Sequence, residues 1–271
     1  MQMTEKQIHY LDKQKTRNAF HNAAMEYDSV TAMQRDVGDR LLSRLDFVQQ
    51  EPEVIADIGA GTGVATGKLI RRYPNASVMA LDIAQGMLHI NKRNNADNPP
   101  VCGVADMHNI PLRSESVGMV FSNLAMQWSN DLLQVLNEYQ RILSAGGLLH
   151  FATFGPQTLN EFKRSWHKID PQGSHVNQFY SVGDIGDLLI EAGFRDVVVD
   201  CEIITLHYPD VVRVMRELKT LGASNRTHGR ARMLTGKDKM RQMIAEYENL
   251  REDGGVPVTY EVIYGHAWSI R

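Results

Sequence analysis

The sequence predicts an α/β fold in which a mostly parallel sheet of seven strands carries helices on both faces. From about residue 54, short runs rich in apolar and β-branched residues alternate with longer stretches of helical character. Three glycines at alternate positions directly follow the first of these strands. A chain of 271 residues is long enough for one such domain with additions, or for two small domains.

We expect a strand at each of seven apolar runs. In chain order these runs cover 53–58, 76–82, 100–106, 118–123, 147–154, 196–208 and 258–268. Helices are expected between them, at about 63–73, 85–95, 131–143, 159–169 and 181–192. The stretch Ala145-Gly146-Gly147 is typical of a helix C-cap and predicts where the third helix ends.

The pattern divides the chain into three parts. Residues 1–50 predict an N-terminal cap of one or two amphipathic helices packed outside the sheet. The α/β domain is expected over 51–208 and 256–271. The charged, helical segment 209–255 is predicted to be an insertion before the last strand that serves as a lid over the substrate.

Composition argues against several classes of protein. The formal net charge is −3, so there is no overall basic field of the kind that favours nucleic acid. Cys102 and Cys201 lie far apart, which predicts neither a disulfide framework nor a zinc site, and we expect no metal. The N-terminal stretch lacks the apolar core of a signal peptide, and no apolar run approaches the ~18 residues of a membrane span. We therefore expect a cytoplasmic protein with no membrane partner.

The first strand ends at Asp57 and leads directly into Gly59, Gly61 and Gly63. Glycine tolerates positive φ and lacks a Cβ, so such a loop can turn sharply while a ligand presses against its main chain. The N–H groups of the following helix can bind an anion or a carboxylate. The dinucleotide fingerprint G-x-G-x-x-G would need glycine where this chain has Val64 or Thr66, and NAD is therefore disfavoured.

The spacing D-x-G-x-G-x-G from Asp57 resembles motif I of the class I S-adenosylmethionine-dependent methyltransferases. This resemblance implies a Rossmann-like fold, S-adenosyl-L-methionine as cofactor and S-adenosyl-L-homocysteine as product. It implies that Asp82 holds the ribose diol, that Asp106 and Met107 border the adenine, and that Asn123 lies beside the methionine moiety. The cofactor-binding residues that it implies are Tyr27, Asp57, Gly59, Gly61, Gly63, Asp82, Ile83, Met87, Asp106, Met107, Asn123 and Leu124. A glycine turn without ligand, a plain helix N-cap at Asp82 and a turn residue at Asp106 are the alternatives.

A closer resemblance covers the chain from about Arg17 to the final strand. The stretches that carry it are "FHNAAMEYD", "SNLAMQW", "TFGPQTLNEF", "LKTLGASN", "HGR" and "LTGKDKM". Together they resemble the malonyl-[acyl-carrier protein] O-methyltransferase family of the biotin pathway. The resemblance implies methyl transfer from S-adenosylmethionine to the free carboxylate of a malonyl thioester on acyl carrier protein, the step that starts pimeloyl and biotin synthesis.

A carboxylate, with a pKa near ~4, is already ionised at neutral pH and needs no general base. Catalysis then depends on placement, for which Tyr27, Lys219 and Arg230 are the candidates. The substrate-binding residues that the resemblance implies are Gln127, Trp128, Phe179, Lys219 and Arg230. A solvated helix face for Lys219, and core packing for Tyr27 and Trp128, are the alternatives.

One position departs from the family pattern. Relatives often read Asn-Arg-Phe where this chain has Asn177, Gln178 and Phe179, so Gln178 supplies no charge for a carboxylate. An O-methyltransferase of a small free carboxylic acid therefore stays open as an alternative. So does an S-adenosylmethionine-binding assembly or modifying protein that is not a methyltransferase. A lesser departure is Gly118, where an aspartate usually opens the fourth strand.

Residues 213–241 contain nine Lys and Arg residues against two acids, a net charge of +7 within an acidic chain. Acyl carrier proteins are acidic, so we expect this segment to dock the carrier protein. The alternative is a solvated helical face. Nucleic acid is disfavoured, because aromatic residues are not interleaved with these charges.

Overall fold

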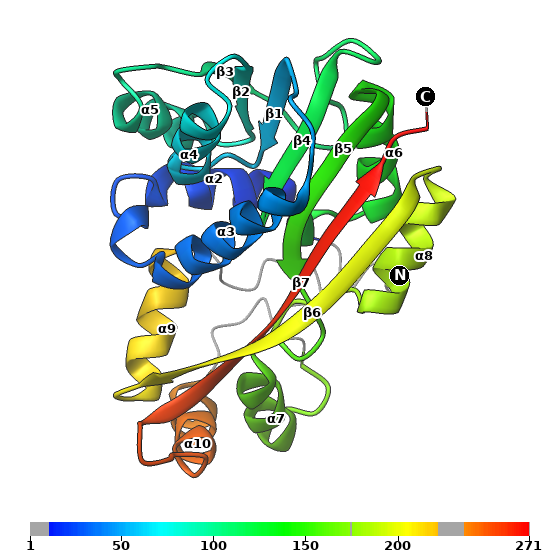
Figure 1. Cartoon of the computed structure of the whole chain (residues 1–271). Helices are drawn as coiled ribbons and strands as arrows, with labels where there is room; N and C mark the ends of the chain where they lie inside the picture. Colours follow the sequence, from blue (N-terminus) through cyan, green and yellow to red (C-terminus); the bar gives the residue numbers. More distant parts are fainter. Residues whose placement is uncertain (1–10, 174, 222–235, 271) are drawn as a thin grey trace.

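The computed structural model describes residues 11–173, 175–221 and 236–270 (Figure 1). Its centre is a seven-stranded sheet with the order β3-β2-β1-β4-β5-β7-β6. The strands are β1 (Val54–Ile58), β2 (Ser77–Asp82), β3 (Val101–Val104), β4 (Val117–Asn123), β5 (Leu143–Phe154), β6 (Arg195–Tyr208) and β7 (Val256–Trp268). Strands β1 to β5 pair in parallel, and β7 runs antiparallel to both β5 and β6. The prediction of a seven-stranded, mostly parallel sheet is confirmed.

Helices cover both faces of this sheet, as predicted. Helix α4 (Val64–Arg72) follows β1, α5 (Gln85–Asn94) follows β2 and α6 (Leu132–Ile142) follows β4. Two helices, α7 (Asn160–Ile169) and α8 (Val182–Glu191), follow β5. On β4, Met119 and Phe121 join the apolar cluster that includes Leu69 of α4, whereas Val120 joins the cluster that includes Val135 of α6. Alternation along a strand therefore fills a core on each face of the sheet.

The prediction of a helix C-cap at 145–147 is wrong. Helix α6 runs directly into β5, which begins at Leu143 and includes these residues. The register shifts here, because Val117 pairs with Leu143 and Met119 pairs with Leu148. Gly146 has a φ of 69°, which this irregular stretch of strand requires. The glycine pair, which is typical of a helix end, therefore lies in an irregular stretch of β5.

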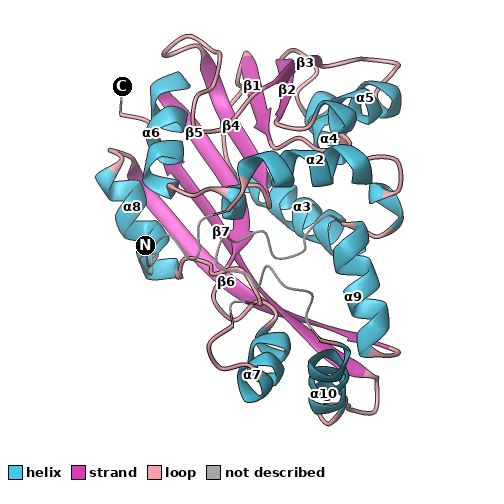
Figure 2. Cartoon of the chain, turned by 180° about the vertical axis from the view of Figure 1, so that it is seen from behind, coloured by secondary structure: helices cyan, strands magenta, loops and turns pink. Residues whose placement is uncertain are grey.

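Within residues 11–53, two α-helices precede the sheet, in agreement with the predicted N-terminal helices. Helix α2 (Lys13–Ala23) packs against α5, and α3 (Ala32–Arg44) packs against α4, β4 and β5 (Figure 2). Between them lies the short 3₁₀ turn η1 (Tyr27–Ser29), and a second turn, η2 (Leu45–Phe47), follows α3. Apolar side chains at helical spacing, including the fully buried Val37 and Leu41, hold α3 against the core.

Beyond the carboxyl end of β5, strands β6 and β7 continue as a long antiparallel pair, with α7, α9 (Val211–Thr220) and α10 (Lys237–Glu248) around it (Figure 1). Phe162 of α7 meets Tyr247 of α10 edge-on, with ring centroids 4.6 Å apart. Helices α9 and α10 agree with the predicted helical insertion, and the domain boundaries stay a prediction. No helix in the described part of the chain is long and apolar enough to cross a membrane.

Candidate active site

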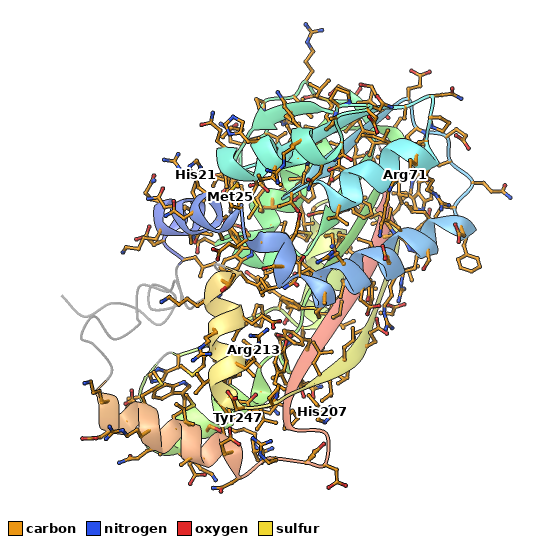
Figure 3. The ribbon with its side chains drawn as sticks, turned by 90° about the vertical axis from the view of Figure 1, so that its left-hand side faces the viewer. His21, Met25, Arg71, His207, Arg213 and Tyr247 are labelled. Carbon is orange, nitrogen blue, oxygen red and sulfur yellow. The ribbon has the colours of Figure 1, made fainter. Side chains whose placement is uncertain are left out.

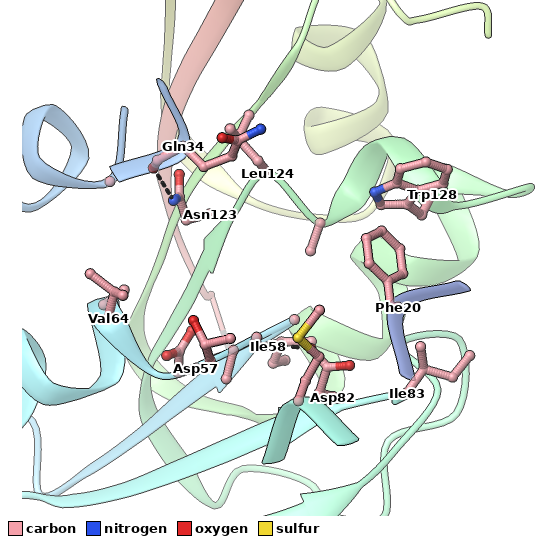
Figure 4. A pocket seen from close by; sticks show the side chains of 18 of the residues that line it. Phe20, Gln34, Asp57, Ile58, Val64, Asp82, Ile83, Asn123, Leu124 and Trp128 are labelled. Atoms are coloured by element: carbon pink, nitrogen blue, oxygen red, sulfur yellow. Dashed lines mark hydrogen bonds between the residues drawn. The ribbon is translucent and has the colours of Figure 1, made fainter. Parts of the chain in front are cut away.

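A cavity opens where the carboxyl ends of β1, β2 and β4 meet the N-terminal helices (Figure 4). Between β1 and β4 the strand order reverses, which is where parallel α/β sheets leave a crevice for ligands. The predicted residues that line this cavity are Tyr27, Asp57, Gly59, Gly61, Asp82, Ile83, Met87, Asp106, Met107, Asn123, Leu124, Gln127 and Trp128. Gly63, Phe179 and Lys219 do not line it, and Arg230 lies outside the described residues.

All three glycines of the loop have positive φ, and the space beside their missing Cβ atoms differs. A Cβ at Gly59 would overlap the side chain of Ala125, and a Cβ at Gly63 would overlap that of Asn91. A Cβ at Gly61 would meet no atom within 4 Å. Gly59 and Gly61 both line the cavity, while the missing Cβ atoms of Gly59 and Gly63 make room for protein side chains. That all three glycines bind the cofactor stays a prediction.

Asp82 ends β2 beside Gly61 and holds the loop in place. One carboxylate oxygen accepts the Gly61 N–H at 2.9 Å, and the other accepts the Ala84 N–H at 2.8 Å. Helix α5 has Ala84 as its N-cap, so Asp82 is not the plain N-cap that the sequence left as an alternative. Burial raises the pKa of Asp82 to about 6, although both N–H donors favour its charged form.

Asp57, at the end of β1, lies beneath the same loop. Its side chain is buried and accepts a hydrogen bond from the Thr66 hydroxyl at 2.6 Å. Burial raises the pKa of Asp57 to about 7, and the nearby Asp82 adds to the rise, while the Thr66 bond opposes it. Two buried carboxyls thus favour a hydrogen-bond donor or a positive charge in this part of the cavity.

Asp106 lies after β3 and is paired with the N-terminal cap. Its carboxylate contacts Lys13 Nζ at 2.9 Å, and it also accepts the backbone N–H of His108 at 3.0 Å. Burial alone would raise its pKa, but these contacts and the His108 ring hold the pKa of Asp106 at about 2. Sequence reasoning missed Lys13, since no local pattern links α2 to a residue 93 positions later.

Above the loop, two residues of the cavity wall, Asn123 and Gln34, each have a side-chain oxygen that accepts no hydrogen bond from the described residues. Asn123 Nδ2 donates to the backbone oxygen of Gln34 at 3.1 Å, drawn as a dashed line in Figure 4. Both Asn123 Oδ1 and Gln34 Oε1 are buried, and neither has a hydrogen-bond partner among the described residues. An unmet buried acceptor is unfavourable, so the pair suits an ammonium group of a ligand. Gln34 was not predicted.

Aromatic side chains form the remaining wall. Phe20 meets Trp128 edge-on at 5.1 Å between ring centroids and lies 6.4 Å from the ring of Tyr27. Burial raises the pKa of Tyr27, so its hydroxyl stays protonated and can donate a hydrogen bond. Phe154 at the end of β5 also lines the cavity, and it was not predicted.

Of the predicted substrate-binding residues, Gln127 and Trp128 line the cavity, but Phe179 and Lys219 do not. Phe179 stands behind the wall, 5.9 Å from Phe154 between ring centroids. Lys219 is exposed on α9, whereas Leu221 at the end of the same helix lines the cavity. Lys219 was named from the family resemblance, and its exposure agrees with the solvated helix face that the spacing left as the alternative.

Known proteins resemble this chain over nearly its whole length. Residues 56–151 match a methyltransferase domain. A malonyl-[acyl-carrier protein] O-methyltransferase of Nitrosospira multiformis is 46% identical over 96% of this chain and 90% of its own length. The corresponding protein of Gallionella capsiferriformans is 43% identical over 95% and 91%.

Solved structures agree on the fold. The YcgJ protein of Bacillus subtilis superposes with a TM-score of 0.61 at 14% identity, over 86% of this chain and 99% of that chain. Phosphoethanolamine N-methyltransferase 2 of Haemonchus contortus, in complex with S-adenosyl-L-methionine, also gives 0.61 at 14% identity, over 94% and 60%. With the sequence relatives, these matches identify the chain as a member of the malonyl-[acyl-carrier protein] O-methyltransferase family, which has the class I methyltransferase fold.

Proposed function

We propose that this protein transfers the methyl group of S-adenosylmethionine to the free carboxylate of a malonyl thioester carried by acyl carrier protein. The observation that carries the proposal is the similarity to named malonyl-[acyl-carrier protein] O-methyltransferases, at 46% identity over 96% of the chain. The cavity supports it, because its polar groups suit the parts of an adenosyl amino acid.

The donor would be held by residues from four segments. Asp82 can accept hydrogen bonds from a ribose diol, and Asp106 and Met107 border the adenine side. The unpaired oxygens of Asn123 and Gln34 can accept from the amino group. Bound S-adenosylmethionine would supply a sulfonium methyl group, whose carbon the carboxylate oxygen attacks as the carbon–sulfur bond breaks and S-adenosylhomocysteine leaves.

The acceptor needs placement more than activation. A carboxylate with a pKa near ~4 is ionised at neutral pH, so the protein has no proton to remove. Phe20, Trp128 and Phe154 present apolar surface that excludes water, and the protonated hydroxyl of Tyr27 can donate a hydrogen bond. Holding two reactants in line contributes about 7–11 kcal/mol to a rate enhancement. Lys219 and Arg230 stay proposals as carboxylate partners.

Within the basic segment 213–241, we assign carrier docking to α9. Arg213, Arg216 and Lys219 are exposed at intervals of three residues, and none has an ion-pair partner in the part of the chain that the structure describes. Figure 3 labels Arg213 on this helix. Helix α9 then leads to Leu221 at the cavity. An acidic carrier bound to this stripe would have its acyl arm near the entrance.

On α10 the positive charges are partly compensated. Lys239 pairs with Asp170 at 3.3 Å, and Arg241 pairs with Asp238 at 3.5 Å. These partners reduce the attraction that α10 can offer an acidic protein, so α9 is the stronger candidate.

The experiment that tests the proposal mixes purified protein, methyl-labelled S-adenosylmethionine and malonyl-acyl carrier protein. We expect label on the acyl group as an ester, and none when the carrier holds an acetyl group. Absence of acyl label with the malonyl carrier would reject the proposal.

A second candidate function is methylation of a small free acid, which Gln178 favours by supplying no charge where relatives have arginine. It predicts labelled product from a tricarboxylate without any carrier protein. The same assay run with small acids in place of the carrier separates the two functions.

A further inference from the structure

Two asparagines of helix α5, Asn91 and Asn94, and its C-cap residue Asn95 face the glycine loop from behind. Their side-chain amides donate to three consecutive loop carbonyls: Asn91 to Gly61 at 3.5 Å, Asn94 to Thr62 at 3.0 Å and Asn95 to Gly63 at 3.1 Å. We call Asn91, Asn94 and Asn95 the asparagine clamp. None of the three lines the cavity.

The asparagine clamp accounts for glycine at two positions, Gly63 and Gly67, which do not line the cavity. A Cβ at Gly63 would overlap the side chains of Asn91 and Asn95, and a Cβ at Gly67 would overlap that of Asn95. Both glycines therefore let α5 approach the loop closely enough for the amides to reach its carbonyls. The third glycine of the motif serves this contact and does not open the cavity.

Fixed carbonyls determine where the loop N–H groups point. A loop with positive φ at residues 59, 61 and 63 has many alternative conformations, because glycine restricts the backbone least. With its carbonyls bonded to α5, the loop presents the Gly61 N–H to Asp82 on the cavity side. A ligand that binds such a loop loses less conformational entropy than one that must order it.

The clamp also joins the loop to two other parts of the site. Asn91 donates to the Thr66 hydroxyl at 3.1 Å, and that hydroxyl donates to Asp57 at 2.6 Å. On the other side, Asn94 lies 3.3 Å from a carboxylate oxygen of Asp28 in the turn between α2 and α3.

The second carboxylate oxygen of Asp28 accepts the Thr62 hydroxyl at 2.6 Å. The N-terminal cap and the loop thus share hydrogen-bond partners with the clamp. Asn94 therefore contacts both the loop and the cap.

We propose that the asparagine clamp is a positioning device that sets the affinity for S-adenosylmethionine without touching it. The inference rests on the proposed function, because it takes S-adenosylmethionine as the ligand of the loop. Asn91, Asn94 and Asn95 act through the loop and contribute nothing to binding of the methyl acceptor.

The test compares wild-type protein with the double variant Asn94→Ala/Asn95→Asp. Asn95→Asp keeps the shape of the side chain but puts an acceptor against the Gly63 carbonyl, and Asn94→Ala removes the donor to Thr62. With two hydrogen bonds to the loop and the Asn94–Asp28 bond lost, we expect the dissociation constant of S-adenosylhomocysteine, measured by calorimetry, to rise about tenfold or more. Asn98→Asp is the matched control, since Asn98 is exposed and introduces the same charge away from the loop.

A general loss of stability would lower the amount of active enzyme, not the affinity of what remains. We therefore expect the KM for S-adenosylmethionine to rise in the double variant, while kcat and the KM for the malonyl carrier stay unchanged. Asn94→Gln keeps an amide donor at an exposed position and should recover most of the affinity that Asn94→Ala loses. If the double variant does not fold, this pair of single variants decides the matter.

The outcomes separate the two proposals. If wild type binds S-adenosylhomocysteine and the clamp variants bind it equally well, the inference is wrong and the proposed function stands. If wild type itself does not bind S-adenosylhomocysteine, the proposed function is wrong and the inference with it.

Discussion

The cavity has two unlike sides. The polar end, formed by Gly61, Asp82, Asn123 and Gln34, is made of backbone groups and polar side chains, and hydrogen bonds to neighbouring elements hold Asp82 and Asn123 in place. The apolar wall, formed by Phe20, Trp128, Phe154 and Leu221, is made of side chains from four separate segments.

This difference indicates how the two substrates are recognised. A donor with fixed polar groups requires fixed partners, and the polar end supplies them in one arrangement. An acceptor that arrives on a carrier protein can be aligned from outside, by charges such as those of α9, and then needs only a dry, apolar wall. Variants on each side should therefore change different kinetic constants.

The largest expected effect is at Gly61, which faces the polar end. Gly61→Val should weaken binding of S-adenosylhomocysteine by about 100-fold, since a side chain forced into a packed contact costs about 1–3 kcal/mol and Val adds backbone strain. The control is Gly146→Val. Gly146 also has positive φ and open space where a Cβ would be added, but it lies near the start of β5 and does not line the cavity. Calorimetry and thermal melting of both variants separate the strain from the loss of the ligand site. Equal affinities in the two variants would refute the loop assignment.

The next effect is at Asp82. Asp82→Ala removes the partner of the Gly61 N–H and an acceptor for the donor hydroxyls, and it should weaken binding by roughly 1.5–3 kcal/mol. A titration with S-adenosylhomocysteine measures this directly. The KM for the malonyl carrier should not change, and a rise in that constant would indicate that the two sides of the cavity are coupled.

Low pH should weaken the binding of S-adenosylhomocysteine at the polar end. Because burial raises the pKa of Asp82 to about 6, lowering the pH to 5 protonates the acceptor and should weaken S-adenosylhomocysteine binding by about tenfold. Asp82→Asn should abolish this dependence.

Acidity should weaken ligand binding, but it should increase the contribution of Asp82 and Asp57 to the free energy of unfolding. The raised pKa values of Asp82 and Asp57 mean that the folded protein binds protons between about pH 4 and 7 that the unfolded chain does not. The contribution of these two carboxyls to stability therefore increases as the pH falls through that range and is lost as it rises. Thermal melts recorded beside the titrations distinguish weaker binding from unfolding.

A smaller effect is expected on the outer surface of α9. Arg213→Glu/Arg216→Glu should raise the KM for malonyl-acyl carrier protein about tenfold at low salt, with less effect at high salt, because exposed charges are screened. S-adenosylhomocysteine binding should stay unchanged. Arg71→Glu, at an exposed arginine on α4, is the control for a simple change of net charge. An unchanged KM in the double variant would remove α9 as the docking surface.

The smallest effect is expected for the ion pair between Lys13 and Asp106. Both side chains are 36% exposed, and pairs of that kind contribute about 0–1 kcal/mol. Lys13→Met should therefore weaken S-adenosylhomocysteine binding about two- to fivefold, measured by calorimetry. Lys15→Met, which breaks a pair within α2, should leave the affinity unchanged. A loss of affinity as large as that of Asp82→Ala would mean that α2 does more than cover the cavity.

The sequence predicted what contiguous residues determine. All seven strands were located, and so was the loop after Asp57, because strand, loop and helix follow one another within a few residues. What each glycine makes room for depends on Asn91, Asn95 and Ala125, which lie much later in the chain, and no spacing rule contains that information.

The contributions of the N-terminal helices were beyond prediction for the same reason. Lys13, Phe20 and Gln34 reach the cavity only because α2 and α3 pack over it, and a helical pattern does not indicate which residues will meet a distant loop. The Ala145-Gly146-Gly147 stretch was misinterpreted because glycine with positive φ serves both helix ends and strand irregularities.

A crystal structure of the protein with S-adenosylhomocysteine tests the account most directly. We expect the ribose hydroxyls at Asp82, the ligand pressed against Gly61, and the amino group within hydrogen-bond distance of Asn123 Oδ1 and Gln34 Oε1. A ligand bound with its amino-acid end away from Gly61, leaving those two oxygens without a donor, would contradict it.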